Sequence, residues 1–178
     1  IGGALTSARM ACEAAKEHGR DRIEVYDDEN QSMIRRYDDM HLVSEIQKAI
    51  DGDEFELRVQ PIESLSGETS NPRFEVLLRM CDSDGEAVPS KALFSAAERY
   101  RLMPQIDRWV VSHTIARIAE HLVAVEEQDA KFAINLSGQS LGDDEILEFV
   151  DDEIKQSGVP ASCLWFEITE SAAVSKLV

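Results

Sequence analysis

The sequence predicts an α/β protein with a mixed sheet, from the order of its apolar strands and amphipathic helices. Strands are expected over residues 54–62, 74–80, 131–136 and 163–169. Helices are expected between the later strands, over residues 90–102, 104–126 and 143–156. The connection 63–73 contains Ser, Gly, Asn and Pro and has no helical pattern. Because a parallel pair needs a crossover of roughly a dozen residues or more, the first two strands are expected to be antiparallel and the later pairs parallel.

Two pieces are expected to precede this sheet. A helix over residues 8–17 and a strand over residues 22–26 are too small to bury a core by themselves. Residues 1–27 therefore look like the tail of another domain. Residues 28–52 are expected to form a connecting helix, because apolar side chains recur there at helical spacing. The sheet-forming domain then covers residues 53–178.

Side-chain alternation predicts the first two strands. Apolar and polar residues alternate from 55 to 60, and Pro61 ends the run. In the second strand Glu75 and Arg79 share one face, while the other face is apolar. Such a strand either lines a site or is an edge strand with one solvated face, and the second explanation is the simpler one for this strand alone. The last two strands are strongly apolar, which favours parallel pairing.

Start and stop signals bound the helices. Pro89 and Ser90 can open the first helix. Residues 104–126 carry apolar side chains at helical spacing and predict one long helix. Gly158, with Pro160 beyond it, is placed to end the third.

Composition and charge exclude several classes of partner. Of 178 residues, 43% are apolar and 30% charged, as in an ordinary globular protein. The net charge of −17 argues against duplex nucleic acid as a partner, because phosphate binding needs clustered Lys and Arg.

The three Cys residues are far apart and lack metal-ligand spacing, so we expect a reducing cytoplasm and neither disulfides nor zinc. No apolar run approaches the roughly 20 residues of a membrane span.

Polar residues on three strands suggest a metal site. Glu75, Asn135 and Glu167 offer two carboxylates and one amide carbonyl, and hard oxygen ligands of this kind suit Mg²⁺, Mn²⁺ or Ca²⁺. Arg79 is placed to pair with a phosphate group, and Gln60, on the polar face of the first strand, to bond a base or a ribose. Each residue also has a structural explanation: a same-face pair for Glu75 and Arg79, a turn for Asn135, and a helix-capping acid for Glu167.

Several short motifs together resemble a known family. They are Gln60-Pro61-Ile62; Glu75-Val76-Leu77-Leu78-Arg79; Phe94, Ala97, Glu98 and Leu102; Ile106-Asp107-Arg108-Trp109-Val110; Asn135-Leu136-Ser137; and Glu167-Ile168-Thr169-Glu170-Ser171. By these motifs residues 41–175 resemble the N-terminal half of the EAL domain, the cyclic di-GMP phosphodiesterase fold. Residues 4–27 resemble the last helix and strand of a GGDEF (diguanylate cyclase) domain. Val76 stands where the EAL motif usually has Ala, on the face away from Glu75.

The resemblance implies a fold and an active site. The fold is a TIM-like (β/α)8 barrel with an antiparallel first strand, of which we expect only about the first half in this chain. Glu75, Asn135 and Glu167 correspond to metal ligands, and Glu75 is the catalytic residue among them. Arg79 corresponds to a phosphate-binding arginine and Gln60 to a substrate contact. The implied cofactor is Mg²⁺ or Mn²⁺, in a two-metal site of the complete domain.

The implied function is hydrolysis of cyclic di-GMP to the linear dinucleotide pGpG in bacterial second-messenger signalling. The family's Asp-Asp-Phe-Gly segment, catalytic Lys and later Glu are not among these residues, so we expect this fragment alone to be inactive. The alternative is a catalytically degenerate EAL domain that acts as a cyclic di-GMP receptor. A homodimer through the barrel domain and a cytoplasmic location are further expectations. Any membrane tether of the parent protein would lie in a region outside this chain.

Overall fold

The computed structural model describes residues 11, 12, 23, 31–65, 71–143 and 145–168. The chain divides into two compact units, residues 1–46 and 47–178. Helix α2, Gln31–Gly52, lies in the region that was expected to form a connecting helix. The helix and the strand predicted within residues 1–27 lie almost entirely outside the described residues.

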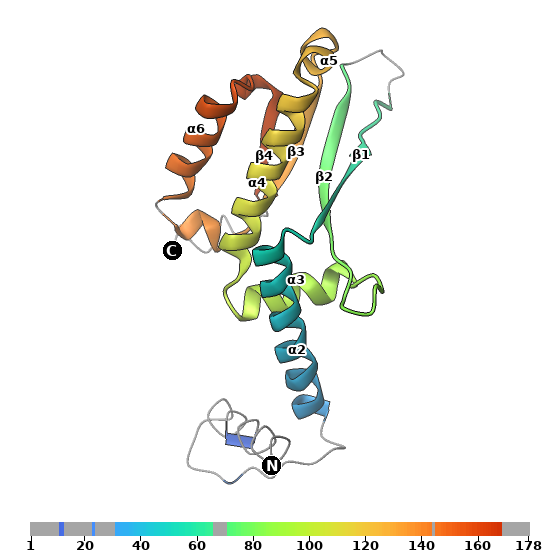
Figure 1. Ribbon diagram of the computed structural model, residues 1–178, viewed down its shortest axis with the longest axis vertical. Helices are drawn as coiled ribbons and strands as arrows, with labels where there is room; N and C mark the ends of the chain where they lie inside the picture. The colour runs from blue at the N-terminus through green and yellow to red at the C-terminus, as the bar shows by residue number, and fades with distance from the viewer. Residues whose placement is uncertain (1–10, 13–22, 24–30, 66–70, 144, 169–178) are drawn as a thin grey trace. The chain divides into compact units, whose positions relative to one another are not determined.

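A four-stranded sheet organises the second unit, with its strands in the order β1-β2-β3-β4 (Figure 1). The strands are β1 Glu56–Pro61, β2 Arg73–Arg79, β3 Lys131–Leu136 and β4 Leu164–Ile168. Strands β1 and β2 are antiparallel, and β3 is parallel to both β2 and β4. The structure therefore confirms the predicted mixed sheet and its antiparallel first pair.

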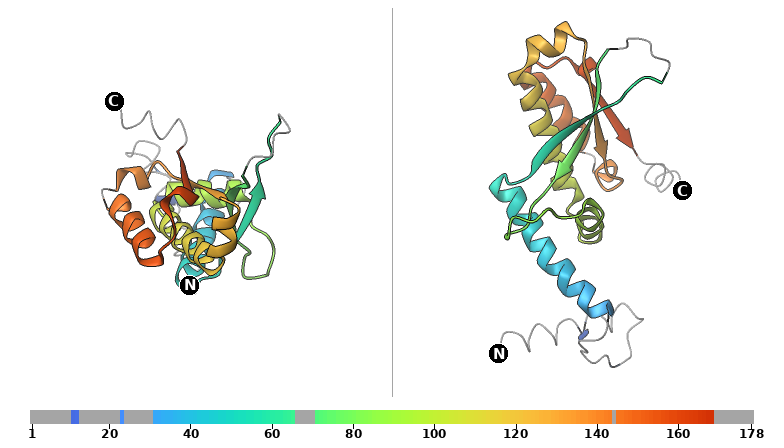
Figure 2. Two further views of the ribbon diagram at one scale, coloured as in Figure 1. Left: turned by 90° about the horizontal axis from the view of Figure 1, so that it is seen from above. Right: turned by 90° about the vertical axis from the view of Figure 1, so that its right-hand side faces the viewer.

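Helices follow β2 and β3, as expected for an α/β fold. They are α3 Ser90–Arg99, α4 Met103–Glu120, α5 Leu122–Glu127 and α6 Ile146–Ser157, with short 3-10 turns at Ser140–Gly142 and Ala161–Cys163. Helix α4 lies across one face of the sheet and contacts β1, β3 and α6 (Figures 1 and 2). Within the described residues, every helix is too short or too polar to span a bilayer.

The hydrophobic core lies between α4 and the sheet. Val76 and Ile134, neighbours in the β2–β3 register, are buried on the face that α4 covers. Helix α4 contributes apolar side chains that are almost fully buried, among them Ile106, Val111 and Ile115. Val111, Ile115 and Ile118, all buried, are spaced by four and three residues and therefore share one side of the helix.

The prediction of one long helix over residues 104–126 is wrong. The helix breaks at His121, whose backbone angles of φ −120° and ψ 22° are not helical, and a separate helix α5 follows. The N–H group of His121 bonds instead to the carbonyl oxygen of Ile118, three residues back. Neither Gly nor Pro marks this break, and the apolar residues Leu122 and Val125 continue the helical spacing across it. The periodicity of the sequence therefore does not reveal the break.

Helix α6 ends as predicted but begins three residues later than expected. Gly158 adopts the left-handed conformation, with φ 72°, at the end of the helix. At the other end Asp143 is extended, with φ −94° and ψ 111°, and follows the 3-10 turn Ser140–Gly142. The carboxylate of Asp143 accepts the N–H group of Glu145 at 3.0 Å, just before the helix.

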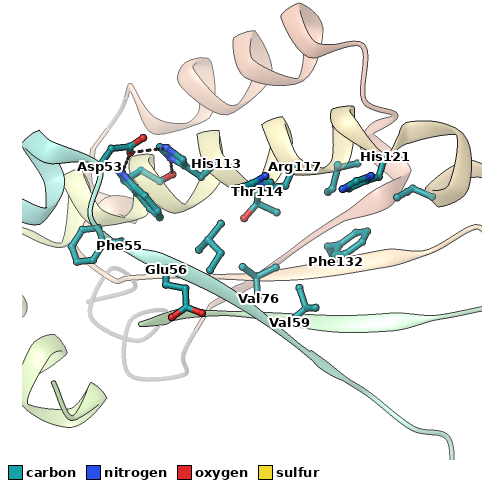
Figure 3. A pocket seen from close by; sticks show the side chains of 14 residues that line it. Asp53, Phe55, Glu56, Val59, Val76, His113, Thr114, Arg117, His121 and Phe132 are labelled. Atoms are coloured by element: carbon teal, nitrogen blue, oxygen red, sulfur yellow. Dashed lines mark hydrogen bonds and ion pairs between the residues drawn. The ribbon is translucent and has the colours of Figure 1, made fainter. Parts of the chain in front are cut away.

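A hydrogen-bonded cluster joins the start of the sheet to α4 (Figure 3). Asp53, with φ 61°, precedes β1, and its Oδ1 accepts from Trp109 Nε1 at 2.6 Å. His113 stacks on the Trp109 ring at 3.8 Å, and Phe55 meets that ring edge-on. Both His113 nitrogens face acceptors at 2.8 Å, Nε2 the Asp53 carboxylate and Nδ1 the carbonyl oxygen of Trp109. Both contacts are satisfied when each nitrogen carries a proton.

The Asp53 cluster predicts a stability change in acid. The hydrogen bond from His113, followed by that from Trp109, holds the pKa of the Asp53 carboxyl below its ordinary value of 3.8. A carboxyl whose pKa is lower in the folded state stabilises the fold above the unfolded pKa, and this contribution is lost as pH falls through the folded pKa. We therefore expect Asp53→Asn to lower the Tm of the full-length protein at about pH 6, and the deficit to shrink toward about pH 3.

Thermal unfolding at constant ionic strength measures this difference. The substitution keeps an acceptor oxygen for Trp109, so the comparison isolates the charge of Asp53. A Tm deficit of equal size at both ends of the pH range would contradict the prediction.

Candidate functional site

Three of the sequence-predicted site residues line one pocket. The pocket has a volume of about 480 Å³, lies at the ends of β2 and β3, and contains Glu75, Arg79 and Asn135. Its other polar and aromatic lining residues come from α3, α4 and the loop after β3, namely Ser90, Phe94, Glu98, Asp107 and Ser137. In parallel sheets the carboxyl ends of the strands are the edge where ligands bind.

Strand register places the other two predicted residues on the same face. Gln60 of β1 is paired directly with Glu75 of β2. Glu75 is in register with Ala133, and alternation returns Asn135 to the same face of β3. Asn135 is in turn in register with Glu167 of β4. Each of the four adjacent strands thus carries at least one predicted residue on this face, although Gln60 and Glu167 are exposed and do not line the pocket.

Glu75 and Asn135 are in direct contact, although 60 residues separate them in the sequence. The Nδ2 atom of Asn135 donates to Oε1 of Glu75 at 2.9 Å. Rotation about the last side-chain bond of Asn135 exchanges its nitrogen and oxygen, so the same position can present Oδ1 beside the carboxylate. A carboxylate and an amide oxygen side by side form part of a ligand set for a hard divalent cation.

The oxygen atoms on this face of the sheet suit a divalent cation, but they do not fill its coordination shell. Glu75, Asn135 and Glu167 supply two carboxylates and one amide, fewer oxygens than the six that Mg²⁺ prefers. Across the described ranges, no three His, Cys, Asp or Glu side chains meet in a way that could hold a metal ion. Water, substrate oxygens or further protein ligands would therefore have to supply the rest.

Arg79 is held at the rim of the pocket by the start of α3. Its Nη1 atom donates to the carbonyl oxygen of Leu78 at 2.8 Å and approaches Oγ of Ser90 at 3.4 Å. Both contacts involve the same terminal nitrogen of a guanidinium that has five N–H donors. A planar, fixed guanidinium suits bidentate binding of a phosphate group.

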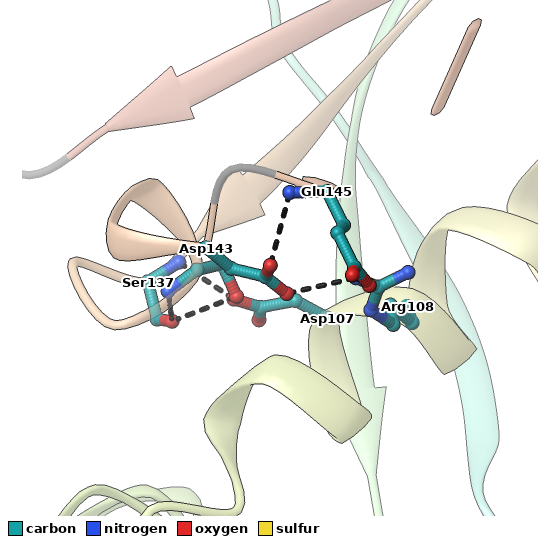
Figure 4. A network of polar contacts seen from close by, with 6 residues as sticks. Asp107, Arg108, Ser137, Asp143 and Glu145 are labelled. Atoms are coloured by element: carbon teal, nitrogen blue, oxygen red, sulfur yellow. Dashed lines mark hydrogen bonds and ion pairs between the residues drawn. The ribbon is translucent and has the colours of Figure 1, made fainter. Parts of the chain in front are cut away.

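Asp107, whose role the sequence did not reveal, is a buried carboxylate that lines the pocket (Figure 4). It is 3% exposed, and its Oδ2 accepts from the N–H group of Ser137 at 2.9 Å and from Oγ of Ser140 at 2.6 Å. Burial raises the pKa of the Asp107 carboxyl, and the hydrogen bonds from the two serines oppose that shift. One feature of the sequence could have indicated this burial. Met103 and Val111 lie four residues before and after Asp107, so Asp107 stands between two apolar residues on one face of the helix.

A second pocket, of about 550 Å³, lies between α4 and the opposite face of the sheet (Figure 3). Leu57, Val76 and Phe132 line its sheet side, and Thr114 and Ile118 its helix side. It is larger than the first pocket and also has polar lining residues, but it contains none of the predicted site residues. Asp53 and His113, two of those polar residues, are bonded to each other in the cluster that joins β1 to α4. We therefore regard the smaller pocket as the candidate functional site.

Comparison with known proteins gives independent matches. A family profile described as EAL domain matches residues 43–177. The chain is 34% identical over 170 residues to the cyclic di-GMP phosphodiesterase PdeB of Shewanella oneidensis, covering 96% of this chain and 20% of that protein. It is 29% identical over 140 residues to the cyclic di-GMP phosphodiesterase PdeF of Escherichia coli, covering 79% of this chain and 18% of that protein. The chain thus spans about a fifth of the length of these relatives.

A solved structure matches the fold. The EAL domain of FimX from Pseudomonas aeruginosa, in a crystal structure bound to c-di-GMP, superimposes with a TM-score of 0.67 at 33% sequence identity. The match covers 76% of this chain and 53% of that chain. It supports the predicted α/β fold class and the expectation that the chain matches only part of such a domain.

Proposed function

The chain belongs to the EAL domain family, and on that premise we propose that its protein is a metal-dependent phosphodiesterase that hydrolyses cyclic di-GMP to pGpG. The observation that carries the proposal is the contact between Glu75 and Asn135 in a pocket that also contains Arg79. These residue types provide the two things that phosphodiester hydrolysis needs, namely oxygen ligands for a cation and a fixed donor for phosphate. The names of PdeB and PdeF support the same reaction class.

Glu75, Asn135 and Glu167 are the residues that would hold Mg²⁺ or Mn²⁺, as one or two ions. A divalent cation there would neutralise phosphate charge and activate a water molecule for attack on phosphorus. The protein's own contribution is geometric. Strand register holds Asn135 beside Glu167 of β4, its amide contacts Glu75 of β2, and the Glu75 carboxylate remains partly exposed at the pocket.

Arg79 and Gln60 are proposed to bind the substrate. With a net charge of −17 the chain repels anions on average, so a dinucleotide needs a local positive group. Arg79, fixed beside Ser90, supplies that charge and matches the geometry of phosphate oxygens. Gln60, opposite Glu75 on the edge strand, can donate to and accept from a base or a ribose.

The proposal includes the domain organisation predicted from the sequence. Residues 1–27 would be the end of a GGDEF-like domain, residues 28–52 a connecting helix, and residues 53–178 the N-terminal part of an EAL-like barrel. The extent of α2, Gln31–Gly52, supports the second of these assignments.

The proposed reaction is tested on the full-length protein. Incubation with cyclic di-GMP and Mn²⁺ should give pGpG, and replacement of Mn²⁺ by Ca²⁺ should suppress it. Binding of cyclic di-GMP without turnover in Mn²⁺ would contradict the proposal and identify a receptor instead.

Glu75→Gln is expected to abolish turnover. It removes the charge of the central ligand while keeping its size, and the loss should exceed the roughly 10- to 100-fold effect that is typical of outer-shell partners of a metal. The matched control is Glu120→Gln, because Glu120 is exposed at the end of α4 and pairs only with Arg117 among the contacts observed there. Steady-state kinetics at saturating Mn²⁺ measures both variants. If Glu75→Gln kept the wild-type kcat, the proposed role of Glu75 in the reaction would be refuted.

Arg79→Lys is expected to raise KM for cyclic di-GMP about tenfold, because an ammonium group cannot reproduce bidentate phosphate binding. Arg117→Lys is the control, since Arg117 is exposed and its ion pair with Glu120 lies outside the candidate site. Initial rates over a range of substrate concentrations give KM for each variant. Equal KM values for the two variants would show that Arg79 does not bind the phosphate.

A further inference from the structure

We propose that Asp107 is a positioning residue for Asn135: it ties the loop after β3 to α4 and thereby keeps the Asn135 amide beside Glu75. The inference deepens the proposed function, because it rests on Asn135 being a metal ligand. Asp107 lines the same pocket, but its Oδ2 atom is hydrogen-bonded to the loop after β3. It acts through the backbone of Ser137, two residues beyond Asn135.

Hydrogen bonds to Asp107 join the loop after β3 to α4 (Figure 4). Oδ2 of Asp107 receives two hydrogen bonds, one from the backbone of Ser137 and one from the hydroxyl of Ser140. The serines are also joined to each other, since the N–H group of Ser140 donates to Oγ of Ser137 at 3.2 Å. Ser140 is fully buried, at 0% exposure. Buried hydrogen bonds to a carboxylate resist rearrangement, because an unpaired partner would remain without water.

The pairing of β3 with β2 ends before the strand itself does. The register of β2 with β3 runs from Arg73–Lys131 to Val76–Ile134 and ends one residue before Asn135. Asn135 and Leu136 remain in register with β4 alone. On the side that faces Glu75, the end of β3 is therefore held by the loop that Asp107 anchors and not by the β2–β3 ladder.

A second contact fixes the far end of the same loop. Nη2 of Arg108, the next residue on α4, lies 2.8 Å from Oδ2 of Asp143, and the Arg108 guanidinium packs over the Phe149 ring. Both side chains of this ion pair are more than a quarter exposed, so water and salt weaken it. Asp107 is buried, and its partner Ser137 directly follows β3, so it is the stronger determinant of the position of Asn135.

The test is the affinity of the full-length protein for Mn²⁺, measured by electron paramagnetic resonance of the free ion. Asp107→Ala should raise the Kd for Mn²⁺ about 10- to 100-fold, the range typical of residues that orient metal ligands. Asp107→Asn keeps an oxygen that can accept both serine hydrogen bonds, so it should restore most of the affinity. At saturating Mn²⁺, KM for cyclic di-GMP should change much less than the Kd for Mn²⁺ in the Ala variant.

Ser112→Ala is the matched control on the same helix. It removes the 2.8 Å hydrogen bond from Ser112 Oγ to Glu153, which joins α4 to α6 and does not involve the loop. It should leave the Kd for Mn²⁺ unchanged, with any loss confined to thermal stability. All variants are compared well below their own Tm.

A folded Asp107→Ala protein with wild-type affinity for Mn²⁺ would overturn the inference. If that variant does not fold, Ser140→Ala removes one of the two donors, and a wild-type Kd in Ser140→Ala would overturn it as well. A wild-type protein that binds Mn²⁺ but forms no pGpG would refute the proposed phosphodiesterase, while the Mn²⁺ affinities still decide the role of Asp107. A wild-type protein that does not bind Mn²⁺ would refute the metal role of Asn135 and this inference with it.

Discussion

The register of β2 against β3 is the constraint on which the site depends. Glu75 is in register with Ala133, and only this pairing brings Asn135 to the same face, within hydrogen-bond distance of the carboxylate. A slip of one residue would turn Asn135 to the opposite face. That slip is prevented by packing, because it would also expose Ile134 and the residues around it that are buried against α4.

The two faces of the sheet therefore have different roles, one in packing and one in the candidate site. One packs against α4 and supplies the apolar burial that fixes strand order and register. The other carries a polar residue on each of four neighbouring strands and remains partly exposed. Helix α4 contributes to both the core and the site. Val110 and Ile115 are buried in the core, and Asp107, at the start of the helix, accepts a hydrogen bond from the loop that follows Asn135. A single helix can thus stabilise the domain and shape the pocket.

Much of this arrangement could be predicted from the sequence, because strand alternation and helical spacing are local. The antiparallel first pair followed from a connection too short for a crossover, and the end of α6 from Gly158. The break at His121 was missed since neighbouring apolar residues continue the helical spacing across it. Asp107 was missed because it was considered only as part of a motif, whereas its role comes from serines about 30 residues away. The contact between Glu75 and Asn135 needed coordinates, because a strand pattern fixes faces but not register.

The central claim is that Glu75 and Asn135 act together on one cation, and a double-mutant cycle tests it most directly. Mn²⁺ affinity is measured for the wild type, Glu75→Gln, Asn135→Ala and the double variant of the full-length protein. If the two side chains share an ion, their effects are coupled, and the double variant should lose less binding free energy than the sum of the single losses, by about 0.5–3 kcal/mol. Strictly additive losses, or single variants with wild-type affinity, would contradict the account.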